Sequence, residues 1–178
     1  MAKLTVEELD GRVGQGWGGL SPNGSHVNVV LACRGSATAA TVIGTLAHPV
    51  PGHTPVLICV GASQPEYEPV WPPTVMINKN TARDDRHEMI TWGAAQLGIG
   101  QGVLDAVADG LIDATAELIV LVSVWVNSTA SDETAVRLAN RTATRAAIAE
   151  CVHGRSSDAV ERLVRDRDAL TNPFYSGD

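Results

Sequence analysis

Two nitrogen bases are the residues best suited to moving protons. His26 opens a valine-rich segment, His-Val-Asn-Val-Val-Leu-Ala-Cys, in which alternation places Asn28 on the same side. An imidazole with an ordinary pKa of about 6.5 can give or take a proton at neutral pH. A histidine at a strand end can also simply bond to a neighbouring loop, so the sequence leaves both interpretations of His26 open.

Lys79 is unusual because arginine outnumbers lysine eleven to two, and the other lysine, Lys3, lies at the start of the chain. A solvated lysine in a loop would need no function. A desolvated lysine could instead form a Schiff base with a carbonyl compound. Gln96 stands among alanines and glycines, where a buried amide could satisfy a helix break.

Metal and thiol chemistry have weaker support. His48 and His53 are separated by prolines and a glycine, and His87-Glu88 lacks the second histidine of a zinc-binding helix. We expect these histidines to be solvent-exposed. Apolar neighbours surround each of the three cysteines, Cys33, Cys59 and Cys151. We expect reduced, unreactive thiols of a cytoplasmic protein.

Strands alternating with helices must position these residues. The hydrophobic pattern predicts strands over residues 26–33, 54–61, 74–78 and 118–126, and helices over 36–47, 84–110, 131–153 and 158–170. Glycines between residues 92 and 102 predict two helices within 84–110. The segment 118–126 is apolar except for Ser123, which predicts burial on both faces. The pattern indicates one α/β (α+β) domain.

A glycine-rich segment, residues 11–25, precedes the first of these strands. Gly14, Gly16 and Gly19 satisfy G-x-G-x-x-G, but a dinucleotide site needs a strand before the motif and a helix after it. An acidic segment precedes and a Ser-Pro-Asn-Gly turn follows, so we reject that interpretation. The glycines are expected to let the backbone pass close to a neighbour or a ligand. We divide the chain into an arm, 1–25, and a domain, 26–174.

Length and composition exclude several classes of protein. The chain has 178 residues, 44% hydrophobic and 19% charged, which is the mix of an ordinary globular domain. A net charge of −7 disfavours nucleic-acid binding. Acidic residues near the start argue against a signal peptide, and the longest apolar run is too short to cross a membrane. We therefore expect a cytoplasmic protein with neither nucleic acid nor membrane as partner.

Four segments together resemble the formaldehyde-activating enzymes. Residues 26–36, ending Ala-Cys-Arg-Gly-Ser, are similar to the opening strand of that family, and Asn-Lys-Asn-Thr (78–81) resembles its Asn-Lys-x-Thr turn. Gly-Ala-Ala-Gln (93–96) resembles its Gly-Pro-Ala-Gln helix start, and Thr-Asn-Pro-Phe (171–174) resembles its closing Thr-His-Pro-Phe. Order and spacing hold from about residue 11 to 174.

The resemblance implies a lyase that condenses formaldehyde with a reduced pterin, tetrahydromethanopterin, with loss of water. It implies no metal and no permanently bound cofactor, a homopentamer, and a fold like the second domain of ribosomal protein S5 with a left-handed βαβ crossover. By motif match the proton donor falls on His26. The pterin contacts fall on Asn28, Leu57, Lys79, Thr81 and Gln96.

The chain departs from the family pattern in three places. Asn28 replaces an aspartate, and an amide accepts through one oxygen only. The stretch around Tyr67 and Trp71 is longer, and the glycine-rich segment carries Trp17. Two alternatives follow: a dehydratase or cyclase that acts on a non-pterin substrate in specialised metabolism, and a formaldehyde or pterin sensor without turnover.

Overall fold

The fold is built on a mixed β-sheet. The structure is a computed structural model that describes residues 3–172. The five-stranded sheet has the order β1-β2-β7-β6-β3, with bounds β1 (Val13–Gly18), β2 (Ser25–Cys33), β7 (Leu118–Val126), β6 (Thr74–Asn78) and β3 (Val56–Leu57). Only the β6–β7 pair is parallel, and the other pairs are antiparallel. The predicted mixed α/β class is confirmed. Pro173 and Phe174 of the closing motif lie outside the described residues.

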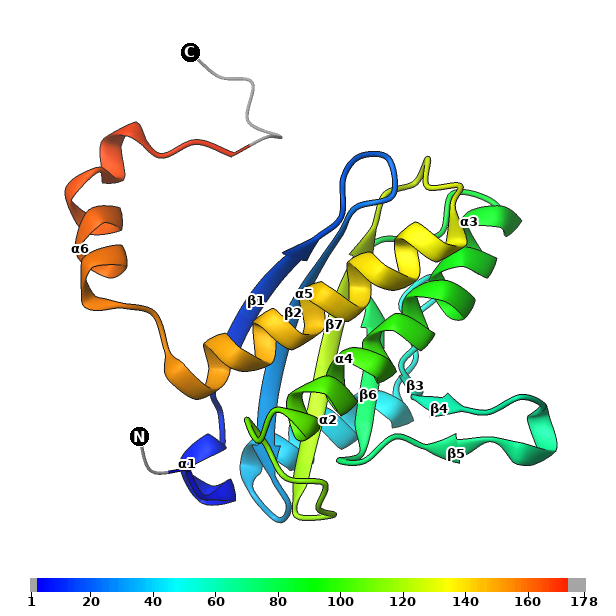
Figure 1. Ribbon diagram of the computed structural model, residues 1–178, viewed down its shortest axis with the longest axis horizontal. Helices are drawn as coiled ribbons and strands as arrows, with labels where there is room; N and C mark the ends of the chain where they lie inside the picture. Colours follow the sequence, from blue (N-terminus) through cyan, green and yellow to red (C-terminus); the bar gives the residue numbers. More distant parts are fainter. Residues whose placement is uncertain (1–2, 173–178) are drawn as a thin grey trace.

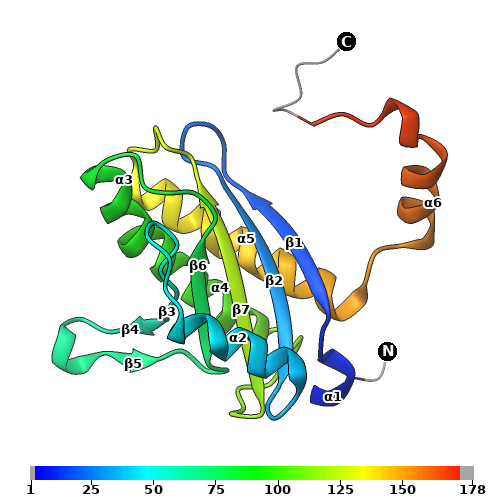
Figure 2. The same ribbon diagram turned by 180° about the vertical axis from the view of Figure 1, so that it is seen from behind.

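Helices cover the two faces of this sheet unequally. The helices are α1 (Val6–Leu9), α2 (Ala37–Ala47), α3 (Asp85–Met89), α4 (Gln96–Ala108), α5 (Glu133–His153) and α6 (Ser157–Arg165). The long helices α4 and α5 lie together across one face, and among the helices of residues 3–172 only α2 lies on the other (Figures 1 and 2). No helix of residues 3–172 has the length and apolarity that a membrane crossing requires.

The main core lies between the sheet and the α4–α5 layer. Val27, Val29 and Leu31 of β2 point into it and are fully buried. Alternate residues of β7, such as Val122 and Val124, do the same. Because side chains alternate along a strand, the residues between them must point to the opposite face, which α2 covers only in part.

The glycine-rich segment forms the edge strand β1, although the hydrophobic pattern predicted no strand there. Gly14, Gly16 and Gly18 alternate on its inner side, and a Cβ on any of them would overlap backbone carbonyl oxygens of α5. The expected close approach to a neighbour is therefore confirmed, and the neighbour is a helix. The absence of side chains on this side lets α5 lie directly against the strand.

The other face is apolar only at one end. There Ala39 and Val42 of α2 pack against Ala32, Val75 and Ile119 of the sheet. Beyond Leu121, the outward side chains of β7 are only half-buried. The prediction that β7 is buried on both faces is therefore right for its first residues and wrong for the rest, because α2 is too short to cover the sheet.

Three predicted segments differ in detail. Segment 84–110 is continuous, because a π-helical stretch, Ile90–Ala95, joins α3 to α4. Segment 54–61 breaks after β3, since β4 (Cys59–Val60) pairs with β5 (Glu68–Pro69) in a separate hairpin that projects from the domain (Figure 1). Helix α6 ends at Arg165, buries no residue and extends away from the domain in both views (Figures 1 and 2). Short 3₁₀ turns occur at Gln64–Glu66 and Arg167–Ala169.

Arginine–carboxylate pairs join the two long helices. Arg141 of α5 makes a two-pronged contact with Asp105 of α4, at 2.6 and 2.7 Å. One helical turn further on, Arg145 pairs with Asp109. The hydrogen bonds from Arg141 hold the pKa of Asp105 below its usual value.

Candidate active site

The part of the sheet that α2 leaves uncovered forms a surface of polar and aromatic side chains, which we call the open face. Cross-strand register places Gln15 and Trp17 of β1 beside His26 and Asn28 of β2, and these beside Ser123 and Trp125 of β7. Ile77 and Lys79 continue the row from β6. Four strands thus bring the open face together from distant parts of the chain.

His26 lies at the centre of the polar contacts on this surface. Its Nδ1 is 2.8 Å from Nζ of Lys79, and its Nε2 is 3.0 Å from Oε1 of Gln15. An amide oxygen can only accept, so Nε2 carries a proton that it donates to Gln15. Nδ1 is therefore the acceptor for Lys79. The imidazole is held in one tautomer between two polar partners.

The backbone after β6 fixes the position of Lys79. The N–H of Lys79 donates to the carbonyl of Val124 at 2.7 Å, which extends the β6–β7 ladder by one residue. The buried amide of Asn78 donates to the carbonyls of Gly52 and Asn80, both at 2.6 Å. The Asn-Lys-Asn turn is thus tied to two other segments, and the lysine side chain starts from a rigid base.

Burial shifts the titration of both bases. Desolvation of its half-buried side chain lowers the pKa of Lys79 to about 8. The pKa of His26 is also lowered, first by burial and second by the charge of Lys79. Two bases in contact titrate as a pair, and repulsion disfavours the doubly charged form. Near neutral pH the pair therefore holds one proton, which either nitrogen can carry.

Two indoles stand next to this pair. The ring of Trp17 lies 6.3 Å from the ring of His26, and it stacks on Trp125 at 5.9 Å. The indole N–H of Trp17 donates to the carbonyl of Gly19 at 3.1 Å, which fixes the ring's orientation. Trp17 keeps 54% of its surface exposed, so it presents an aromatic wall to any molecule on the open face.

The structure brings some of the predicted site residues together and separates two, Leu57 and Gln96, from the open face. Asn28 is exposed on the open face, two residues along β2 from His26. Thr81 follows the lysine turn, beside Gly52. Leu57 is 44% exposed and lines a groove of about 660 Å³ between α2 and the sheet edge. Gln96 lies on α4, so the sheet separates it from His26 within one chain (Figure 1).

Gln96 has a cavity of its own. It lines a space of about 400 Å³ with Tyr67 from the β4–β5 hairpin, Trp92, Glu133 and Arg137. This cavity combines an aromatic wall with an amide and two charged groups of opposite sign. Such a lining can hold a flat polar ring, but it lies on the helix side of the sheet.

Gln15 and Trp125 are contacts of the site that the sequence interpretation missed. The signal for Gln15 was the strict alternation of glycine with larger residues in Val-Gly-Gln-Gly-Trp-Gly, which marks a strand with one bare side. For Trp125, the signal was its place among outward residues of β7. It went unused because we expected both faces of that strand to be buried.

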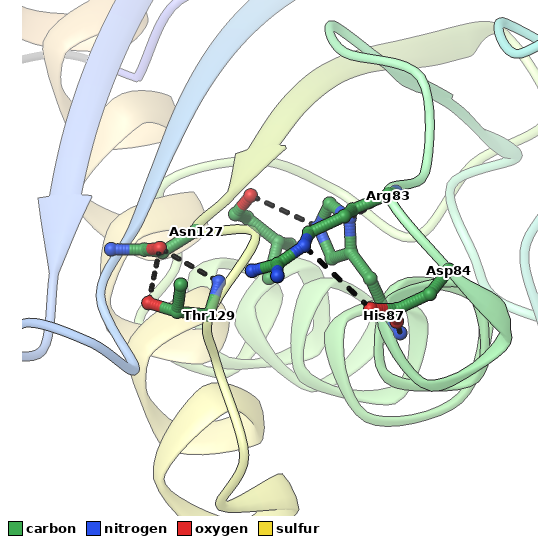
Figure 3. Close-up of polar contacts among 6 residues, drawn as sticks. Arg83, Asp84, His87, Asn127 and Thr129 are labelled. Atoms are coloured by element: carbon green, nitrogen blue, oxygen red, sulfur yellow. Dashed lines mark hydrogen bonds and ion pairs between the residues drawn. The ribbon is translucent and has the colours of Figure 1, made fainter.

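The expectation that His87 is solvent-exposed is wrong. It is buried at the start of α3, where its Nε2 donates to the carbonyl of Val126 at 3.1 Å and its Nδ1 accepts from the N–H of Arg83 at 3.0 Å (Figure 3). Asp84 caps the same helix by accepting from the His87 N–H. His87 thus ties α3 to the end of β7. Within residues 3–172, no group of three His, Cys, Asp or Glu side chains could hold a metal ion.

The sequence of this chain is similar to those of known proteins over nearly its whole length. The family model described as "Formaldehyde-activating enzyme (Fae)" matches residues 13–175. A 5,6,7,8-tetrahydromethanopterin hydro-lyase of Methanosarcina barkeri is 32% identical over 173 residues, which are 96% of this chain and 94% of that protein. A bifunctional enzyme Fae/Hps of Archaeoglobus fulgidus is 26% identical over 93% of this chain, and the match spans 41% of that longer protein.

Proposed function

Because this chain belongs to the formaldehyde-activating enzyme family, we propose that it condenses formaldehyde with a reduced pterin of the tetrahydromethanopterin type, with loss of water. The observation that carries this proposal is the His26–Lys79 contact of 2.8 Å on the open face of the sheet. The open face supplies one singly protonated pair of bases and an aromatic wall in one place.

His26 is the proposed general acid. A secondary amine of the pterin adds to formaldehyde and gives a carbinolamine. Collapse to the iminium expels hydroxide, which is a poor leaving group unless a proton arrives with it. The imidazole would supply that proton, an effect of about 10²–10⁴-fold. Holding both reactants on one surface adds effective concentration.

The pterin contacts are proposed to be Asn28, Leu57, Lys79, Thr81 and Gln96. Leu57 would pack against a ring face, and the polar groups would bond its amide-rich edge. Within one chain Gln96 lies on the far side of the sheet from His26. A homo-oligomer in which the Gln96 side of one copy meets the open face of the next would reunite them, which supports the proposed homopentamer.

Several finer expectations remain proposals. We propose that the reaction needs no metal and no permanently bound cofactor, and that the pterin is a co-substrate. We also propose a fold like the second domain of ribosomal protein S5, with a left-handed crossover in its βαβ unit. A cytoplasmic location stays a prediction.

Initial rates of condensation, measured with and without the protein at matched pH, test the function. We expect His26→Gln to lower the catalysed rate by about 10²–10⁴-fold. His48→Gln is the matched control, because the exposed His48 ring contacts the Gly44 carbonyl of its own helix and should keep the full rate when replaced. A His26→Gln protein as fast as wild type would end the assignment of His26.

The altered pocket supports a second candidate function, a dehydratase or cyclase that acts on a non-pterin substrate with His26 still moving the proton. Asn28 accepts through one oxygen where a carboxylate has two, and Trp17 adds a bulky ring beside His26. Titration with reduced pterins separates the two: the absence of saturable binding would favour this candidate. Binding without turnover would favour a sensor.

A further inference from the structure

We propose that Lys79 captures formaldehyde covalently and carries the one-carbon unit as a methylene iminium before an acceptor amine removes it. This deepens the proposed function, since it rests on formaldehyde as the substrate. It gives the lysine a chemical role beyond contact with the pterin.

The pair places a nucleophile next to an acid. Nζ of Lys79 lies 2.8 Å from Nδ1 of His26, so a single proton can be held by either nitrogen. When the imidazole holds it, the amine of Lys79 has a free lone pair and faces an imidazolium. The same transfer that arms His26 as an acid therefore makes Lys79 a nucleophile.

The surroundings of Lys79 make its neutral amine easier to form than that of an exposed lysine. Nζ is half-buried, and within residues 3–172 no carboxylate lies within ion-pair distance of it, whereas Lys3 pairs with Asp113. In the described part of the chain, His26 is the one charged or titratable side chain that contacts Lys79, and Gln15 behind it is neutral. Burial without a counter-ion lowers the pKa of Lys79 to about 8, which raises the fraction of free amine.

The capture step balances in atoms and charge. The lone pair of Nζ attacks the carbonyl carbon, a C–N bond forms, and the electron pair of the C=O π bond moves to oxygen. That oxygen takes the proton of His26, and the imidazole then accepts a proton from Nζ to give a neutral carbinolamine. The imidazolium returns this proton to the hydroxyl group, water leaves, and the nitrogen lone pair forms the C=N bond of the iminium.

Transfer to the acceptor restores the enzyme. One nitrogen of a diamine acceptor attacks the iminium carbon, and the second displaces Nζ from that carbon. The two protons that the acceptor nitrogens lose end on Lys79, which leaves as the ammonium form. The products are a methylene bridge on the acceptor and the original singly protonated pair. No oxidant or reductant is consumed.

Reductive trapping tests the proposal directly. The full chain is treated at neutral pH with formaldehyde and cyanoborohydride, whose hydride converts an iminium into a stable N-methyl group, and peptide mass spectrometry locates the methyl. We expect Lys79 to be methylated about tenfold or more faster than Lys3, since an amine with a pKa of about 8 has far more free base than an ordinary lysine. Adding a reduced pterin should discharge the iminium and reduce trapping.

Two variants and two outcomes make the test decisive. Lys79→Arg keeps a positive charge but forms no iminium, so its trapping should vanish, whereas Lys3→Arg should leave trapping at Lys79 unchanged. Methylation of Lys79 no faster than that of Lys3 overturns the proposal, and catalysed condensation in the same sample would show that the proposed function survives it. Trapping at Lys79 without catalysed condensation would support the capture step and refute the condensing function.

Discussion

Trp17 stacks on Trp125 although the strand that carries His26 runs between their own strands. The two indoles are 108 positions apart in the chain (125 − 17), and their stack lies beside the imidazole. A flat substrate bound over His26 would lie against this aromatic surface. Loss of the exposed ring should therefore affect binding more than chemistry.

Trp17→Leu is expected to weaken the binding of a ring-containing substrate by about tenfold, since aromatic stacking contributes about 0.5–1.5 kcal/mol beyond burial. The expected signature is a raised KM with an almost unchanged kcat. Trp71→Leu is the matched control, because Trp71 precedes β6 while Lys79 follows it. Equal KM effects of the two substitutions would argue against the aromatic wall.

The catalysed rate should fall as pH rises through about 8, where the His26–Lys79 pair loses its last proton. A general acid works in its protonated form, so activity is present below the pKa and lost above it. In Lys79→Met, the charge that lowers the pKa of His26 is absent, and so is the amine with a pKa of about 8. The fall in rate should therefore occur at a lower pH, closer to the ordinary pKa of an imidazole. A pH–rate profile with the same limb in both proteins would contradict shared proton storage.

Alanine substitution at two glycines, Gly16 and Gly44, should have opposite effects on stability. A Cβ at Gly16 would overlap the Ala143 carbonyl of α5, so Gly16→Ala should lower the free energy of unfolding by about 3 kcal/mol. Gly44 lies within α2 with no atom within 4 Å of its would-be Cβ. Gly44→Ala should therefore raise that free energy by about 0.5–1 kcal/mol. Thermal unfolding followed by circular dichroism measures both, and a stable Gly16→Ala would refute the close strand–helix contact.

Cys151 should resist alkylation in the folded protein. Burial, with a smaller effect of Glu150, raises its pKa to about 12, so thiolate is scarce at pH 8. Against an ordinary thiol we expect about a thousandfold slower labelling. Mass spectrometry after brief iodoacetamide treatment, with and without denaturant, checks this. Rapid native labelling of Cys151 would mean that the sheet–α5 contact opens readily.

Local patterns predicted most elements of this fold. Alternation located β2, a continuous valine-rich apolar run located β7, and Ser36 caps α2 as its position in the sequence indicated. The strand in the glycine-rich segment was missed because its pattern becomes meaningful only when α5 lies against the bare side. The predicted strand 54–61 breaks at Ile58, where the chain passes from the five-stranded sheet to the β4–β5 hairpin. This break depends on which strands β3 and β4 pair with, so the local sequence does not predict it.

The candidate site was predictable as a set of residue types but not as a geometry. His26 and Lys79 were singled out from their chemistry, yet they are 53 positions apart and meet only because β6 and β2 both pair with β7. Gln15 could not be assigned to the imidazole before β1 was recognised. The separation of Gln96 from His26 follows from a helix crossing to the other layer, which sequence spacing does not encode.

The arginine pairs between α4 and α5 bear on how a protein tolerates a reactive aldehyde. A guanidinium stays protonated and delocalised, so its nitrogens offer no available lone pair near neutral pH. Ammonium groups in those places would exchange protons and compete for the carbonyl compound. Arg141 and Arg145 hold the two helices together without adding an amine, so Lys79 is the single lysine amine in the body of the chain.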